Sequence, residues 1–227
     1  MAKDKAEETK TGKKGNGLES VKNEMGPMGF IGTGIGVVAL IVVAVIFFIN
    51  NNKSKKNENA QDELFQAQYY FEADSLDLAM NGDGRNLGFL SIIDIYGGTE
   101  AGNLANFYAG AVYLQQGNFQ QALDYLDDFS TSEVLLGARA DELKGDAFME
   151  LGQYSDAATS YGYAASAVDD KFFSPGYLLK AALAHENAGD INAALVAVTK
   201  VVDNYFGASE YDNAKKQKAR LEVLASR

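Results

Sequence analysis

Three segments of the chain repeat one pattern of residues, and this repetition limits the possible folds more than any other feature. The segments align on three glycines that are 35 and 37 residues apart. Five positions match in each segment: those seven and four residues before the glycine, the glycine itself, and those two and five residues after it. In order, they are Gly110, Tyr113, Gly117, Phe119 and Ala122 in the first segment; Gly145, Phe148, Gly152, Tyr154 and Ala157 in the second; and Ala182, His185, Gly189, Ile191 and Ala194 in the third. Several positions that recur in register predict a protein built from stacked repeats.

The residue types at these positions predict pairs of antiparallel helices. Small residues let two helices approach closely, and the large residues beside them fill the space around the contact. Glycine permits the left-handed backbone that ends the first helix of a pair. One pair cannot bury its apolar face alone, so successive pairs stack. The sequence therefore predicts an all-α fold, an α-solenoid of antiparallel helix pairs.

The repeats resemble those of the tetratricopeptide (TPR) family, whose period is about 34 residues. On this resemblance we expect a TPR-like helical domain over residues 62–227. Its repeats would lie near residues 103–136, 138–172 and 175–208, with a capping helix at 211–225.

The sequence before the first repeat departs from the repeat pattern, as is typical of the end of a solenoid. We expect one long helix over residues 62–80, the turn Asn-Gly-Asp-Gly-Arg, and a partner helix over 87–96. Residues 51–61 are rich in Asn and Lys and predict a polar linker.

A second feature lies nearer the N-terminus, where Phe30 to Ile49 are apolar apart from Thr33 and three glycines. Twenty such residues in a helix span about 30 Å, the thickness of the hydrocarbon core of a membrane. We therefore expect a single transmembrane helix over residues 26–50. Gly32 and Gly36 have the spacing that lets two transmembrane helices pack closely.

The alternative for this segment is a cleaved signal peptide, whose apolar region is shorter and ends in small residues. Here the apolar region ends in Phe-Phe-Ile and runs into a Lys-rich stretch, which favours a retained helix. Residues 1–25 form a charged tail with six Lys and five acidic residues, and three more Lys follow the apolar segment. This excess of Lys before the helix predicts a cytoplasmic N-terminus and a C-terminal domain that faces the periplasm or the exterior.

Residues 57–227 hold 11 basic and 26 acidic residues, a net charge of −15. Such a domain repels phosphate groups, which argues against binding of nucleic acid or of an anionic membrane surface. The chain has no Cys and one His, so it lacks the residues of thiol catalysis and of common zinc sites. We expect no enzymatic activity, no cofactor, no metal and no small-molecule substrate, and we expect His185 to fill a packing position.

The TPR resemblance implies that the first helix of each repeat lines a groove that binds protein. The implied groove residues are Leu104, Phe107, Ala111 and Leu114; Arg139, Glu142, Asp146 and Met149; and Gly176, Leu179, Leu183 and Glu186. In the alternative, these residues only pack on neighbouring repeats. The basic residues with which some TPR domains hold a C-terminal carboxylate are missing, because Phe107 and Ala111 occupy those slots.

The layout of tail, membrane helix and acidic TPR-like domain resembles that of the bacterial ancillary subunit of the SecYEG translocon. This resemblance implies a location in the bacterial inner membrane with the TPR-like domain in the periplasm. It also implies association with the Sec channel and transfer of secreted polypeptides to periplasmic chaperones. The partners would then be channel subunits, chaperones or nascent chains. The alternative is a membrane-anchored TPR scaffold that organises another complex of the cell envelope.

Overall fold

The computed structural model describes residues 54–226, and the regular elements in this range are all α-helices, as the sequence predicts. The helices are residues 54–72, α3 (Leu76–Asn81), α4 (Phe89–Tyr96), α5 (Glu100–Gln115), α6 (Phe119–Asp128), α7 (Val134–Glu150), α8 (Tyr154–Val168), α9 (Ser174–Asn187), α10 (Ile191–Asn204) and α11 (Tyr211–Ala225).

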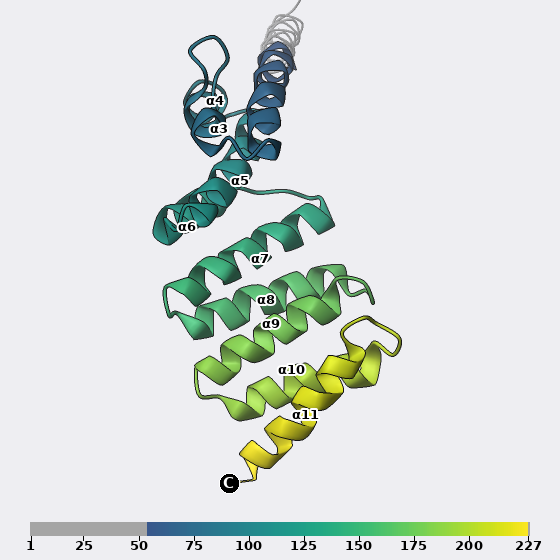
Figure 1. The fold of residues 1–227 in the computed structure, drawn as a ribbon. Helices are drawn as coiled ribbons and strands as arrows, with labels where there is room; N and C mark the ends of the chain where they lie inside the picture. Colours follow the sequence, from purple (N-terminus) through teal and green to yellow (C-terminus); the bar gives the residue numbers. More distant parts are fainter. Residues whose placement is uncertain (1–53, 227) are drawn as a thin grey trace, which may run out of the picture. The chain divides into compact units, whose positions relative to one another are not determined.

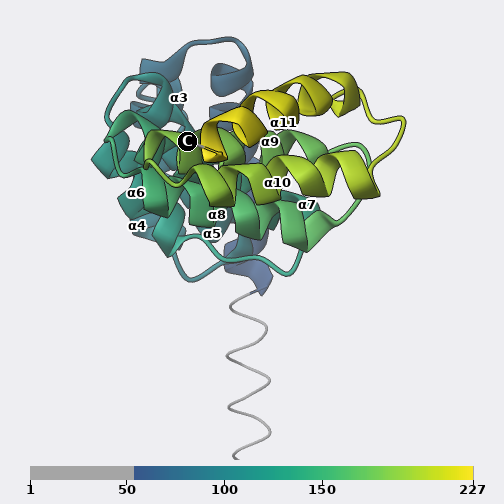
Figure 2. The same ribbon diagram turned by 90° about the horizontal axis from the view of Figure 1, so that it is seen from below.

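Consecutive helices pack in antiparallel pairs, and each pair packs on the next along the stack (Figure 1). The pairs are α5 with α6, α7 with α8, and α9 with α10. In Figure 2, which looks at the stack from its C-terminal end, α11 lies beside α10. Ala214 and Leu221 of α11 are buried there, so this helix covers the apolar end of the stack. The prediction of a solenoid-like stack of helix pairs is confirmed for this part of the chain.

The turn inside each of the three pairs has the same backbone conformation. Gly117, Gly152 and Gly189 have φ values of 78°, 72° and 82°. The N–H of each glycine donates to the carbonyl three residues before it, and the next N–H donates to the carbonyl five residues before. These two bonds are those of the Schellman motif, which ends a helix at a left-handed residue. The predicted role of the three glycines is confirmed.

The small residues Gly110 in α5 and Gly145 in α7 lie tightly against the partner helix of their pair. A Cβ atom on Gly110 would lie 2.6 Å from Cγ of Leu126, and one on Gly145 would lie 2.5 Å from Cε1 of Tyr161. Both distances are well below a van der Waals contact between carbon atoms. The close approach predicted at these positions is therefore confirmed.

The structure also contains a fourth copy of the repeat turn, between helix 54–72 and α3. Asp74 takes the place of the glycine, with a φ of 56°. Its N–H donates to the carbonyl of Phe71 and the next N–H donates to that of Tyr70, the bonds of the other three turns. The small residues of the pattern are Ala67 and Ala79, and both are fully buried in one cluster.

This fourth pair corrects two predictions for the start of the domain. The single helix expected over residues 62–80 is wrong, because the left-handed Asp74 ends one helix and α3 begins two residues later. The polar linker expected over residues 51–61 is wrong for residues 54–61, which are helical. Ala60 is fully buried in this stretch, and the side chain of Asn57 accepts a hydrogen bond of 3.1 Å from the N–H of Ala101 in α5.

No helix within residues 54–226 is both long and apolar enough to cross a membrane. The transmembrane helix predicted over residues 26–50, with Gly32 and Gly36, lies outside the described residues. So do the charged tail over residues 1–25 and the first part of the expected linker.

Candidate functional site

A hollow of about 580 Å³ opens between the first helices of the three repeats. Its walls are apolar side chains from α5, α7 and α9 together with a few charged ones. The lining residues are Leu114, Gln115, Gly117, Phe119, Asp146, Met149, Glu150, Tyr161, Lys180 and Leu183. We call it the Leu183 hollow, because Leu183 lines it and is 51% exposed.

Two further hollows, each of about 440 Å³, adjoin the first one. The Arg139 hollow is lined by Arg139, Glu142, Phe172, Phe173, Gly176, Tyr177 and Lys180. The Arg220 hollow is lined by Gly176, Leu179, Lys180, Leu183, Glu186, Gln217 and Arg220. Lys180 lines all three hollows, which therefore adjoin one another, and we call the three hollows together the groove.

Nine of the twelve residues predicted for the groove line these hollows. They are Leu114, Arg139, Glu142, Asp146, Met149, Gly176, Leu179, Leu183 and Glu186. Leu104 lines a separate hollow of about 350 Å³ next to the turn between α6 and α7. The structure therefore brings together the predicted residues of the second and third repeats, with Leu114 as the contribution of the first.

Phe107 and Ala111 are buried and do not line the groove, which corrects the prediction for these two positions. Phe107 is only 8% exposed. Its ring centroid lies 5.4 Å from that of Phe129, and both residues belong to a cluster with Ala140 and Leu143 of α7. Here the alternative holds, because the ring packs on the neighbouring repeat instead of facing solvent.

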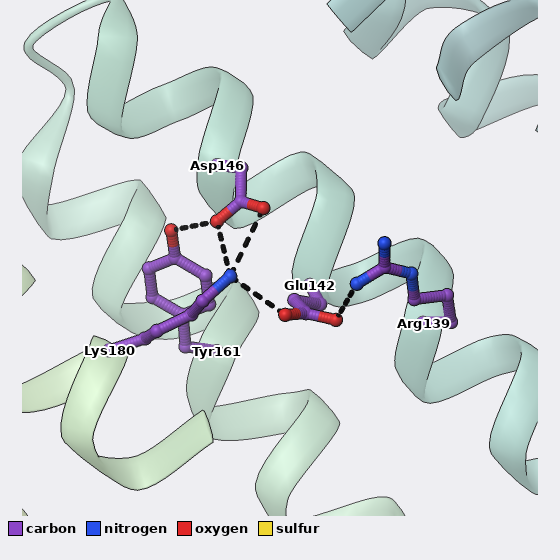
Figure 3. A network of polar contacts seen from close by, with 5 residues as sticks. All are labelled: Arg139, Glu142, Asp146, Tyr161 and Lys180. Atoms are coloured by element: carbon purple, nitrogen blue, oxygen red, sulfur yellow. Dashed lines mark hydrogen bonds and ion pairs between the residues drawn. The ribbon is translucent and has the colours of Figure 1, made fainter. Parts of the chain in front are cut away.

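The centre of the groove holds a network of five polar side chains (Figure 3). Nζ of Lys180 lies 2.7 Å from Oε1 of Glu142 and 2.8 Å from Oδ1 of Asp146. The hydroxyl of Tyr161 donates to Oδ1 of Asp146 at 2.6 Å, and Arg139 donates to Oε2 of Glu142. These contacts join α7, α8 and α9, so the network ties the second repeat to the third.

The pKa shifts in the network follow from these contacts. Burial by itself raises the pKa of Glu142, but the hydrogen bonds from Lys180 and Arg139 outweigh it and lower the pKa below 4.5. Burial by itself lowers the pKa of Lys180, and the bonds to Asp146 and Glu142 raise it above 10.5. Burial and the nearby Asp146 both raise the pKa of Tyr161. At neutral pH, Glu142 and Lys180 are therefore charged and Tyr161 is a neutral hydrogen-bond donor.

Sequence reasoning missed Lys180, Tyr161 and Arg220, which are prominent in the groove. Lys180 stands one position after the slot held by Leu179, and Tyr161 lies on the second helix of its repeat. Arg220 lies on α11, where it makes two hydrogen bonds to Glu186, the longer at 2.6 Å. The available signal was charge, since basic residues are scarce in this acidic domain.

The remaining candidates for chemistry lie apart from the groove hollows. His185 is half-buried on α9 and lines none of them. Asp83 closes a turn, since its carboxylate accepts hydrogen bonds from the N–H groups of Arg85 and Asn86 and from the Tyr70 hydroxyl. Within residues 54–226, no cluster of three or more acidic or His side chains is arranged to hold a metal ion.

No protein-family model matches this chain, and a comparison with curated proteins gives no match. The function proposed below therefore rests on the repeats, the groove and the layout of the sequence.

Proposed function

We propose that this chain is a membrane-anchored protein-interaction module of the TPR type that binds polypeptide in its groove. The observation that carries the proposal is the groove around Lys180, which consists of three adjoining hollows of about 580, 440 and 440 Å³. A groove that combines apolar walls with a few charged groups suits an extended or helical segment of another protein.

The TPR assignment draws support from the repeated turn and from the buried small residues. Four turns share one hydrogen-bond pattern, and each first helix has a small buried residue seven positions before the turn. These four residues are Ala67, Gly110, Gly145 and Ala182. Stacked pairs of this kind present an extended surface on the side of their first helices, as binding solenoids do.

A binding role fits the chemistry of the groove better than an enzymatic role. The charged groups at its centre satisfy one another, since Lys180 bonds to two carboxylates and Arg220 to a third. A catalytic base or nucleophile needs a reactive atom held toward an open position. We therefore propose no catalytic residue, no cofactor and no small-molecule substrate.

As to its place in the cell, we propose an ancillary subunit of the Sec translocon in a bacterial inner membrane. The membrane helix at residues 26–50 would contact the channel, and the periplasmic domain would receive secreted polypeptides or the chaperones that take them over. The layout of the sequence supports this proposal. A scaffold for another envelope complex shares the same layout and is the second candidate.

The proposal is tested by purifying the tagged full-length protein from membranes in a mild detergent and identifying what accompanies it. We expect Sec channel subunits in near-stoichiometric yield. They should be lost when residues 26–50 are exchanged for an unrelated membrane helix, because that helix makes the proposed contact. Channel subunits no more abundant than in an untagged control, together with a different complex, would favour the scaffold.

A further inference from the structure

We propose that the Leu183 hollow selects polypeptide segments in which an apolar side chain stands next to basic side chains. This inference rests on the proposed function, because it names the chemistry of the partner that the groove binds. It is carried by the walls of the hollow and by the charges at its edge.

The walls of the hollow suit an apolar side chain. Leu114, Met149 and Leu183 come from three successive first helices, and Phe119 begins α6 beside them. Leu183 is half-exposed, so the groove leaves apolar surface in contact with water. An apolar side chain that covers this surface releases the water and is stabilised by the hydrophobic effect.

The charged groups that line the same hollow are Asp146, Glu150 and Lys180, which sum to a negative charge. Lys180 is already bonded to Asp146 and to Glu142. Glu150 is exposed and takes part in no ion pair within residues 54–226. A basic side chain of a ligand therefore finds an available carboxylate at the edge of the hollow.

An acidic ligand meets the opposite situation. To bind the Lys180 ammonium, a ligand carboxylate must displace Glu142 or Asp146, which lie 2.7 and 2.8 Å away. Arg220 is held in the same way by both carboxylate oxygens of Glu186. Capture of a C-terminal carboxylate is therefore disfavoured here, and the net charge of −15 over residues 57–227 adds long-range repulsion.

The test uses three short fluorescent peptides that share the same Leu and Ser residues and differ at three positions. These positions are all Lys in the first peptide, all Gln in the second and all Glu in the third. Binding to the full-length protein in a non-ionic detergent is measured by fluorescence anisotropy at low and high salt. We expect the Lys peptide to bind about tenfold more tightly than the Glu peptide at low salt, with a smaller ratio at high salt. Glu150→Gln should weaken binding of the Lys peptide about two- to fivefold, with little effect on the Gln peptide.

Matched variants locate the effect. Asp203→Asn removes one exposed carboxylate from α10, outside the groove, and should leave the affinity for the Lys peptide within about twofold. Leu183→Ser should weaken all three peptides, whereas Val196→Ser on α10 should weaken none.

The outcomes separate the two proposals. Equal affinities of the three peptides, or tighter binding of the Glu peptide, overturn the selection of basic segments. The groove remains the binding site in that case if Leu183→Ser still weakens binding of the peptides. Equal losses from Glu150→Gln and Asp203→Asn also overturn it, because attraction would then come from the whole domain. Binding that Leu183→Ser leaves unchanged, or no binding of any peptide, contradicts the proposed function itself.

Discussion

Replacing Phe107 by Ala is expected to lower the free energy of unfolding by about 3–5 kcal/mol. The ring is buried between α5, Phe129 and the α7 residues Ala140 and Leu143, so its removal leaves a cavity that the neighbouring backbone cannot fill. Urea unfolding of the full-length protein, followed by far-UV circular dichroism, measures the change.

Leu183→Ala is the matched control, because Leu183 was predicted from the same repeat pattern but lines the open groove. Half of its side chain is already in water, and we expect a loss of less than about 1 kcal/mol. Equal losses for the two variants would contradict the distinction between a core position and a groove position.

Lys180→Met is expected to lower the free energy of unfolding by about 2–3 kcal/mol at neutral pH. The substitution keeps the length of the side chain and removes its charge. Glu142, whose side chain is only 11% exposed, then keeps Arg139 alone as a charged partner. Asp146 loses its ion pair with the ammonium and keeps the hydrogen bond from Tyr161.

The same substitution at Lys144 provides the comparison. Lys144 pairs with Asp127 at 2.7 Å, but the Asp127 side chain is 68% exposed. Pairs that face water contribute about 0–1 kcal/mol. A loss from Lys180→Met no larger than that from Lys144→Met would mean that the central network contributes no more than a surface ion pair.

The cost of Lys180→Met should also depend on pH. The pKa of Glu142 is lowered in the folded state. Its contribution to the free energy of unfolding is therefore present above the pKa of the unfolded state and is lost as the pH falls through the lowered pKa, below 4.5. The pKa of Lys180 is raised in the folded state. Its contribution to the free energy of unfolding is therefore present below the pKa of the unfolded state and is lost as the pH rises through the raised pKa, above 10.5. The difference between wild type and variant is therefore largest between these limits and shrinks at acid pH.

The sequence was sufficient to predict the helix pairs because their turns and close contacts depend on residue types with few substitutes. Gly117, Gly152 and Gly189 supply left-handed conformations, and Gly110 and Gly145 supply close contacts. The first pair was missed because Asp74, which also tolerates a left-handed backbone, stands where glycine was sought. Ala67 and Ala79, seven residues before and five after Asp74, were the remaining signal.

The groove was harder to predict than the fold, because it depends on contacts between repeats. The same slot of the pattern holds Phe107, which packs in an apolar cluster, and Glu142, which is equally buried but lines the groove and pairs with Lys180. Only the packing of α5 on α7 decides between these outcomes. Lys180 meets Glu142 and Asp146 across 38 and 34 positions of sequence, a juxtaposition that no local pattern encodes.

The groove as the binding face is tested most directly by photo-crosslinking from single positions in the full-length protein in native membranes. A photoreactive side chain at Leu183 samples the groove, and one at Val196, which is 69% exposed on α10, samples a surface outside it. We expect a discrete crosslinked partner from position 183, at a yield several times that from position 196. Yields from position 196 that equal or exceed those from position 183 would contradict a binding groove on the first helices of the repeats.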